Sequence, residues 1–169
     1  LSGFSAAELG AIAIKAALER ANMQPDEVDH VLMGQVLMAG QGQVPARQAA
    51  VKAGIPMSVP AVNINKVCLS GVNTIYLAHQ LIAAGDAEIV VAGGMESMTN
   101  TPYIAMGGRA GFRYGNVELA DGIIKDGLFC SFGNVLMGEG TDRDTGTTIS
   151  RDEQDQFAVT SNVRAAAAQ

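Results

Sequence analysis

The chain has no tryptophan and is poor in several other residue types. Of its 169 residues, two are cysteine, five are proline and 5% are aromatic. The two cysteines, Cys68 and Cys130, lie far apart and make no disulfide framework, which favours a reducing compartment, the cytoplasm. No apolar run approaches the length of a membrane span. The first residues lack the charged and apolar regions of a signal peptide. The sequence therefore predicts neither secretion nor a membrane anchor.

Positive charge is also scarce. Lysine and arginine number 11 against 17 aspartates and glutamates, and no basic cluster occurs. This balance argues against binding to nucleic acid or to an anionic membrane surface. Hydrophobic residues make up 48% of the chain, which is enough for one substantial core. We expect one domain, or one domain and a further piece.

Helical and strand patterns alternate along the first hundred residues. The expected elements, in order, are a helix capped by Ser5 with Glu8 in the capping box, a buried strand over 30–38, a helix from Pro45 that Gly54 ends, a buried strand over 61–67, a helix that ends at Gly85, and a strand over 88–92. This alternation predicts an α/β sandwich with a largely parallel sheet.

The character of the chain changes after residue 95, where periodicity is lost and glycine, methionine and aromatic residues recur. A structureless loop of that length is unusual unless it is functional, so we expect an inserted lobe with short helices near 117–124 and around Asn134. A last helix then begins at Ser150, with Phe157, Ala158 and Ser161 on its inner face. The predicted domains are 1–98 for the core, 99–148 for the inserted lobe and 149–169 for the returning helix.

Cys68 stands where an apolar β-branched run turns into a helical pattern. A thiol at such a joint lies near free backbone N–H groups and the positive end of the helix dipole, and both favour the thiolate. This is one way in which proteins make a cysteine nucleophilic. The other interpretation is a small buried hydrophobe, the more common role of a single cysteine in apolar surroundings.

No other pattern in the chain indicates a catalytic or metal site. His30 and His79 have no ligand at the spacing of a zinc site, so we expect both to be structural. The glycines after residue 92 do not complete a dinucleotide fingerprint, and no Walker A sequence occurs. Cys130 has aromatic neighbours and no basic residue nearby in sequence, so we expect it to serve in packing.

Two long motifs resemble the thiolase family, in the N-terminal half of its acetyl-CoA acetyltransferase (acetoacetyl-CoA thiolase) type. The first is Asn65-Lys-Val-Cys-Leu-Ser-Gly71. The second is Ala84-Gly-Asp-Ala-Glu-Ile-Val-Val-Ala-Gly-Gly-Met-Glu-Ser-Met98. Further similar stretches are 34–40, 45–56, 124–128, 137–138 and 150–157, so the resemblance covers nearly the whole chain.

The resemblance implies a thiolase-type layered αβα half with an inserted loop lobe, and an acyltransferase (EC 2.3.1). Cys68 would attack an acyl-CoA thioester to form an acyl-enzyme, with its backbone N–H as an oxyanion donor. A second acetyl-CoA would then give a 3-ketoacyl-CoA, as in fatty acid metabolism; the reverse is thiolysis. Leu128 and Met137 match positions that line the acyl and pantetheine pocket. The resemblance implies acyl-CoA as the substrate, no tightly bound cofactor or metal, and a homodimer or homotetramer.

The chain also departs from the family pattern. The family's activating histidine and proton-shuttling second cysteine lie in a C-terminal half that has no counterpart here, and its first strand is also absent, so we expect a fragment that is inactive alone. Leu136 stands where many members carry histidine, and 138–144 replaces the common helix after Met137. Two alternatives stay open: a ketoacyl-synthase-like condensing enzyme, or a non-catalytic homologue that serves in dimerisation or lipid binding.

Overall fold

The computed structural model describes residues 1–146 and 148–169, which form two compact units, Leu1–Gly127 and Leu128–Gln169. The units are called unit 1 and unit 2 below, and each is described by itself. The boundary between them differs from the predicted divisions at 98/99 and 148/149, which stay predictions. Residue 147, inside the predicted lobe, lies outside the described residues.

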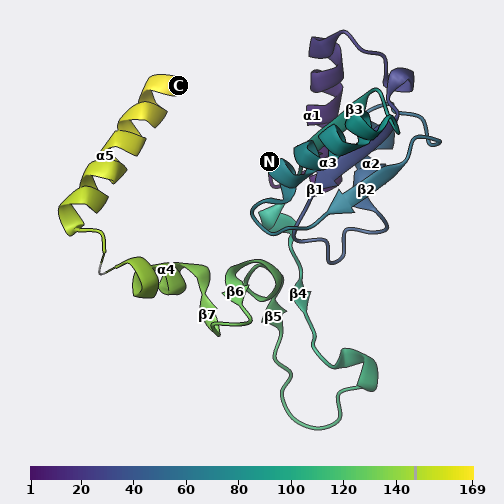
Figure 1. The fold of residues 1–169 in the computed structure, drawn as a ribbon. Coiled ribbons are helices and arrows are strands. Elements are labelled where there is room, and N and C mark those ends of the chain that lie inside the picture. The colour runs from purple at the N-terminus through teal and green to yellow at the C-terminus, as the bar shows by residue number, and fades with distance from the viewer. Residues whose placement is uncertain (147) are drawn as a thin grey trace. The chain divides into compact units, whose positions relative to one another are not determined.

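A parallel three-stranded sheet forms the centre of unit 1 (Figure 1). Its strands are β1 (His30–Gly34), β2 (Ala61–Ile64) and β3 (Val90–Gly94), in the order β2-β1-β3. Val31 of β1 lies opposite Ala61 of β2 and Val91 of β3. The central strand is almost fully buried because helices cover both faces of the sheet.

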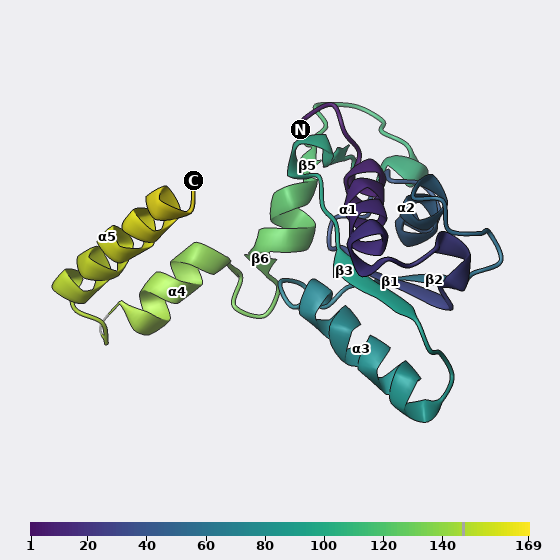
Figure 2. The same cartoon turned by 90° about the horizontal axis from the view of Figure 1, so that it is seen from above.

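Three helices complete the layers of unit 1. The helices α1 (Ala6–Ala21) and α2 (Pro45–Lys52) lie on one face, and α3 (Ser70–Ala84) lies on the other (Figure 2). The main core is built from apolar side chains of α1, α2 and β1, many of them alanine, together with Val28, Ile55, Val59 and Met95. This αβα layering with a parallel sheet confirms the predicted α/β class.

The ends of these helices follow the sequence signals. Ser5 and Glu8 form the predicted capping box of α1, with the Glu8 carboxylate 2.9 Å from the Ser5 amide nitrogen. These hydrogen bonds, first the one from the Ser5 amide, lower the pKa of Glu8. Asn22 ends α1 in the left-handed conformation, and Gly85 does the same for α3. The predicted bounds of α1, α2 and α3 are thus confirmed to within a residue or two.

The remaining elements are short except for two helices. Unit 1 also contains the 3-10 turns η1 (Pro25–Glu27), η2 (Met98–Asn100) and η3 (Gly108–Ala110), the antiparallel pair β4 (Tyr103–Ile104) and β5 (Ala120–Asp121), and a π-helical turn, η4 (Ile124–Leu128), that runs into unit 2. Unit 2 contains the antiparallel pair β6 (Phe129–Cys130) and β7 (Val135–Leu136), followed by α4 (Met137–Thr145) and α5 (Arg151–Ala168).

Two predicted strands were too long, and one was wrongly described as buried. The strand expected over 30–38 ends at Gly34, because the amides of Val36 and Leu37 turn toward the carboxylate of Glu96 instead of a neighbouring strand. The strand expected over 61–67 ends at Ile64, and β2 is an edge strand with Val62 exposed. The third strand is shifted by two residues, to Val90–Gly94.

The helices predicted after residue 98 were mostly wrong. The stretch 117–124 holds β5 and the start of a π-helical turn, and Asn134 lies in the β6–β7 turn with φ 50°. A helix, α4, does form after Leu136 despite Gly138 and Gly140. The capping box of Ser150 and Glu153 is confirmed. The inner face of α5 is not, since none of its side chains is buried among the described residues and Phe157 is 77% exposed.

The expectation that no stretch approaches a membrane span was also wrong. The segment Val67–Ala84, which contains α3, is long and apolar enough to cross a membrane by length and composition alone. In the structure α3 instead packs on the sheet through Ser70, Thr74 and Ala78. Its composition therefore reflects a helix of an α/β layer whose other face, with Val72, Ile75 and Tyr76, this chain leaves exposed.

Candidate active site

Cys68 lies in a tight turn that joins β2 to α3. The strand ends at Ile64 and the helix begins at Ser70, so five residues connect them. Cys68 is exposed and unpaired. The predicted place at a strand-to-helix joint is therefore confirmed, and the interpretation as a small buried hydrophobe is wrong for this chain. The first amides of α3 follow two residues later, where the helix dipole favours negative charge.

Val67, directly before Cys68, adopts a left-handed conformation with φ 48°. A β-branched residue rarely does so, because its side chain crowds the backbone, at a cost of about 1 to 2 kcal/mol. Such strain persists only where surrounding contacts impose it, and it is concentrated at functional sites. The turn is therefore held in one conformation rather than left free, and that conformation directs the residue that follows.

Hydrogen bonds from two polar side chains hold this turn. The Oδ1 atom of Asn65 accepts a hydrogen bond from the Val67 amide at 3.0 Å. The buried hydroxyl of Ser70 accepts one from the Lys66 amide at 2.9 Å and donates one to the Val67 carbonyl oxygen at 2.5 Å. Both peptide groups of Val67 thus have partners. Among the described residues, none of the turn's hydrogen bonds uses the Cys68 amide as donor.

Close backbone packing fixes the start of α3 on the sheet. A Cβ atom on Gly34 would stand 2.6 Å from the Gly71 nitrogen, so only glycine fits at the end of β1. The fully buried Thr74 hydroxyl bonds to the carbonyl oxygens of Gly71 at 2.6 Å and Gly93 at 3.1 Å. The helix start, and with it the Cys68 turn, is seated on β1 and β3.

Polar side chains that the sequence reasoning missed lie beside the turn, at the carboxyl ends of the strands. Glu96 follows β3, and its carboxylate accepts hydrogen bonds from the amides of Val36 at 2.8 Å and Leu37 at 3.3 Å. The Val36 carbonyl oxygen accepts one from Asn65 at 3.4 Å. Ligand sites of parallel sheets lie at this edge. The predicted strand bounds hid these residues, since Asn65 fell inside the strand expected over 61–67 and Glu96 lay four residues past the strand expected over 88–92.

Neither histidine of the chain lies beside Cys68. His30 begins β1, at the opposite edge of the sheet from the Cys68 turn. His79 is an exposed residue of α3, nine residues after Ser70, which places it roughly 14 Å along the helix from its start at about 1.5 Å per residue. Neither histidine is therefore placed beside the candidate nucleophile, and the structural role expected for both stays a prediction. No group of residues able to hold a metal ion occurs in the described chain.

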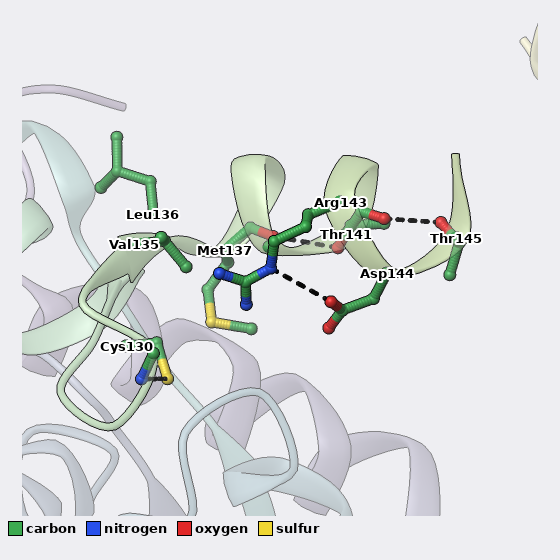
Figure 3. Close-up of a pocket in the computed structure, with 10 residues that line it drawn as sticks. Cys130, Val135, Leu136, Met137, Thr141, Arg143, Asp144 and Thr145 are labelled. Carbon is green, nitrogen blue, oxygen red and sulfur yellow. Dashed lines mark hydrogen bonds and ion pairs between the residues drawn. The ribbon is translucent and has the colours of Figure 1, made fainter. Parts of the chain in front are cut away.

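The other two candidate residues, Leu128 and Met137, both lie in unit 2 and are half exposed. Met137 begins α4 and lines a cavity of about 250 Å³ together with Cys130, Leu136 and Arg143 (Figure 3). Leu128 is not among the residues that line this cavity. The structure therefore places Met137 at this cavity of unit 2, and Leu128 does not share it.

Cys130 has a different environment from the predicted packing role. The adjacent Phe129 and Phe132 are 37% and 98% exposed, so they do not enclose it. Its sulfur accepts a hydrogen bond from the Gly133 amide at 3.3 Å. This amide, then that of Phe132 and the Arg143 guanidinium lower the pKa of the Cys130 thiol. The expectation that it has no basic partner was wrong, because α4 brings Arg143 close from thirteen residues further along the chain.

Comparison with known proteins identifies the family. A family model described as "Thiolase, N-terminal domain" matches residues 1–169. A probable acetyl-CoA acetyltransferase of Mycobacterium leprae is 53% identical over 169 residues, which are 99% of this chain and 43% of that protein. Acetyl-CoA acetyltransferases of Cupriavidus necator (100% of this chain, 43% of that protein) and Schizosaccharomyces pombe (97% and 42%) are 53% and 50% identical. The chain spans about two fifths of the length of these curated relatives. It belongs to the thiolase family, whose N-terminal domain it represents.

Proposed function

We propose that the protein transfers acyl groups between coenzyme A thioesters, with Cys68 as the nucleophile. One observation carries the proposal: Cys68 is exposed in a strained, hydrogen-bonded turn at the start of α3. The names of the relatives, acetyl-CoA acetyltransferases, support acetyl-CoA as a substrate. Hydrogen bonds within the chain fix the turn, which is the arrangement that positions a nucleophile for attack.

In the first step the Cys68 thiolate attacks the carbonyl carbon of acetyl-CoA, a carbon–sulfur bond forms, and coenzyme A leaves as its thiolate. A thiolate suits this exchange because one thioester replaces another, so the thiolates of Cys68 and coenzyme A are comparable leaving groups. The carbonyl oxygen becomes an oxyanion in the transition state, and the Cys68 amide is the donor that this chain supplies. That amide is not used as a donor within the turn, which supports the assignment.

In the second step another acetyl-CoA loses a proton from its α carbon, and the resulting carbanion attacks the acetylated Cys68. The products are acetoacetyl-CoA and the free Cys68 thiolate, and the reverse sequence is thiolysis of a 3-ketoacyl-CoA. We assign the removal of this α proton to no residue of this chain, since His30 and His79 lie away from the turn. The chain on its own is therefore proposed to be inactive.

Leu128 and Met137 are proposed to line the acyl and pantetheine pocket. This assignment rests on the resemblance of their motifs, together with the exposure of both side chains, which leaves them available to a ligand. Replacing Met137 by alanine is expected to raise the KM for acyl-CoA and to change kcat less, because the contact is present in both ground and transition states. A change in kcat alone would contradict a binding role.

The whole protein is proposed to be a homodimer or homotetramer in the cytoplasm. Two exposed features support the self-association: β2 is an edge strand, and α3 exposes Val72, Ile75 and Tyr76. Both cysteines are free thiols, which suits a reducing compartment. No cofactor is proposed beyond the coenzyme A substrate. Light scattering of the full-length protein would test the oligomer, and a monomer would contradict it.

Intact mass measurement after incubation with acetyl-CoA tests the central claim. The full-length protein is expected to gain the mass of one acetyl group, and the Cys68→Ala variant is expected to gain none. Cys130→Ala serves as the matched control and should acetylate like the wild type. An unmodified wild type would overturn the proposal and favour a non-catalytic homologue. Acetylation from carrier-protein thioesters but not from acetyl-CoA would favour a ketoacyl-synthase-like enzyme.

A further inference from the structure

A chain of hydrogen bonds connects the ends of all three strands with the peptide before Cys68. The Glu96 carboxylate, after β3, accepts a hydrogen bond from the Val36 amide at 2.8 Å. The Val36 carbonyl oxygen, after β1, accepts one from the side-chain nitrogen Nδ2 of Asn65 at 3.4 Å. The Asn65 Oδ1 atom, after β2, accepts one from the Val67 amide at 3.0 Å. Asn65 is thus the side chain in this series of hydrogen bonds that contacts the strained residue, Val67, directly.

The position of Asn65 matters because Val67 does not favour its own conformation. With φ at 48° and a β-branched side chain, Val67 would relax toward negative φ if its partners were removed. Such a change would rotate the peptide group that carries Cys68 and would redirect its sulfur. The hydrogen bond from the Val67 amide to Asn65 opposes that rotation on one side of Val67, and Ser70 opposes it on the other.

Glu96 fixes the other partner of Asn65. The backbone amides of Val36 and Leu37 lie past the end of β1 and, among the described residues, donate to no neighbouring strand. Without the Glu96 carboxylate, these two amides would lose the acceptor that they have here. Two hydrogen bonds to one partly buried carboxylate hold that segment in place. The carbonyl oxygen that Asn65 contacts is therefore held at a constant position.

We propose that Asn65 is a positioning residue for Cys68, and that Glu96 anchors it through Val36. The proposal rests on the proposed function, since it concerns how the nucleophile is aimed at a thioester. A neutral amide can set the direction of the sulfur without adding charge beside the thiolate. The effect is expected in the reaction with acetyl-CoA, which needs an aligned attack, rather than in reactions that need only an accessible thiol.

The test compares two reactions of Cys68 in the full-length protein. Single-turnover acetylation by acetyl-CoA is followed by intact mass, and alkylation of Cys68 by iodoacetamide is followed in parallel by peptide mapping, which separates it from alkylation of Cys130. In Asn65→Ala, acetylation is expected to slow by about 10-fold to 100-fold, since misplacement of about 1 Å can have effects of this size. Alkylation is expected to stay close to the wild-type rate. Asn65→Ser keeps a short hydrogen-bond acceptor for the Val67 amide and is expected to restore part of the acetylation rate.

Two further variants complete the design. Glu96→Ala is expected to slow acetylation in the same selective way, and the Asn65→Ala and Glu96→Ala double variant is expected to be no slower than the slower single variant, because both act through one chain of contacts. Asn162→Ala is the matched control, since the Asn162 side chain also donates to a backbone carbonyl oxygen, in α5. It should behave like the wild type.

Each outcome decides the proposal. Wild-type acetylation rates in Asn65→Ala, equal loss of acetylation and alkylation, or fully multiplicative effects in the double variant would overturn it. If Asn65→Ala fails to fold, Asn65→Ser decides: a wild-type acetylation rate would overturn the proposal, and selective slowing would support it. A wild type that is never acetylated would overturn the proposed function, and this inference with it. An acetylated wild type with unaffected variants would overturn the positioning role alone.

Discussion

Gly34 at the end of β1 lies directly against Gly71 at the start of α3, so closely that a Cβ atom on Gly34 would stand 2.6 Å from the Gly71 amide nitrogen. The neighbouring atom belongs to the backbone and cannot move aside as a flexible side chain can. Only glycine at position 34 allows the helix to start this near the sheet, whereas a Cβ atom on Gly71 would meet no other atom of the described chain within 4 Å. The place of the Cys68 turn therefore depends on a residue that is distant from it in sequence.

Replacing Gly34 by alanine is expected to lower the free energy of unfolding by about 3 kcal/mol, the upper end of the usual range for overpacking. It should also slow acetylation of Cys68, because the start of α3 must shift. Denaturant unfolding of the full-length protein measures the first effect. Gly93→Ala is the control, since a Cβ atom there meets only the Met33 side chain at 3.8 Å. Equal stability of the two variants would contradict the close-packing argument.

The sequence predicted well what depends on local signals. The capping boxes at Ser5 and Ser150, the proline and glycine at the ends of α2, and the joint at Cys68 all arise from contacts between residues near in sequence. The predictions failed where distant residues decide. The Val36 and Leu37 amides leave the strand pattern because of Glu96, sixty residues away, and Cys130 is influenced by an arginine on a helix that was not predicted.

The remaining errors concern which apolar residues are buried. Periodicity identified α3 and α5 as helices, but it does not show which face a partner covers. On α3 the small residues Ser70, Thr74 and Ala78 face the sheet, whereas the larger apolar residues are exposed. In the same way, the apolar composition of β2 predicted burial, although the strand lies at the edge.

Cys130 is expected to react with iodoacetamide at lower pH than an ordinary thiol. The Gly133 and Phe132 amides and the Arg143 guanidinium all lower its pKa, and Arg143→Gln removes the last of these. The pH profile of alkylation should therefore move to higher pH in Arg143→Gln, but only in part, since the amides remain. A Cys68→Ser background removes the other cysteine of these 169 residues, and peptide mapping follows the alkylation of Cys130 itself. Arg151→Gln, where the arginine pairs with Asp155, is the control. An unchanged profile in Arg143→Gln would contradict this environment.

Asp29 is expected to stabilise unit 1 at neutral pH and to lose this effect in acid. Its carboxylate accepts hydrogen bonds from the amides of Ile89 at 2.9 Å and Glu88 at 2.8 Å, and these lower its pKa. A carboxyl group with a lowered pKa in the folded state contributes stability that is complete above its unfolded pKa and is lost as the pH falls through the folded one.

Asp29→Asn should therefore unfold at lower denaturant concentration than the wild type at pH 7, and the difference between the two should shrink in acid. Asp26→Asn changes an exposed carboxylate nearby and should show no such trend. A difference that is constant with pH would contradict the prediction.

Ser70 joins the two halves of the Cys68 turn, so Ser70→Ala is expected to loosen it. The hydroxyl is the partner of the Lys66 amide and the Val67 carbonyl oxygen, and the side chain is only 4% exposed. Loss of these two hydrogen bonds should lower the free energy of unfolding by about 2 kcal/mol, at the usual net value of about 1 kcal/mol for each bond. Acetylation of Cys68 should fall more than this small change in stability implies, because one of the two side chains that hold Val67 in its left-handed conformation is then lost and only Asn65 remains. Thermal unfolding and single-turnover acetylation measure the two effects, with Ser58→Ala, an exposed serine, as the control. If Ser70→Ala unfolds earlier but acetylates at the wild-type rate, the strained turn contributes to the fold and not to the reaction.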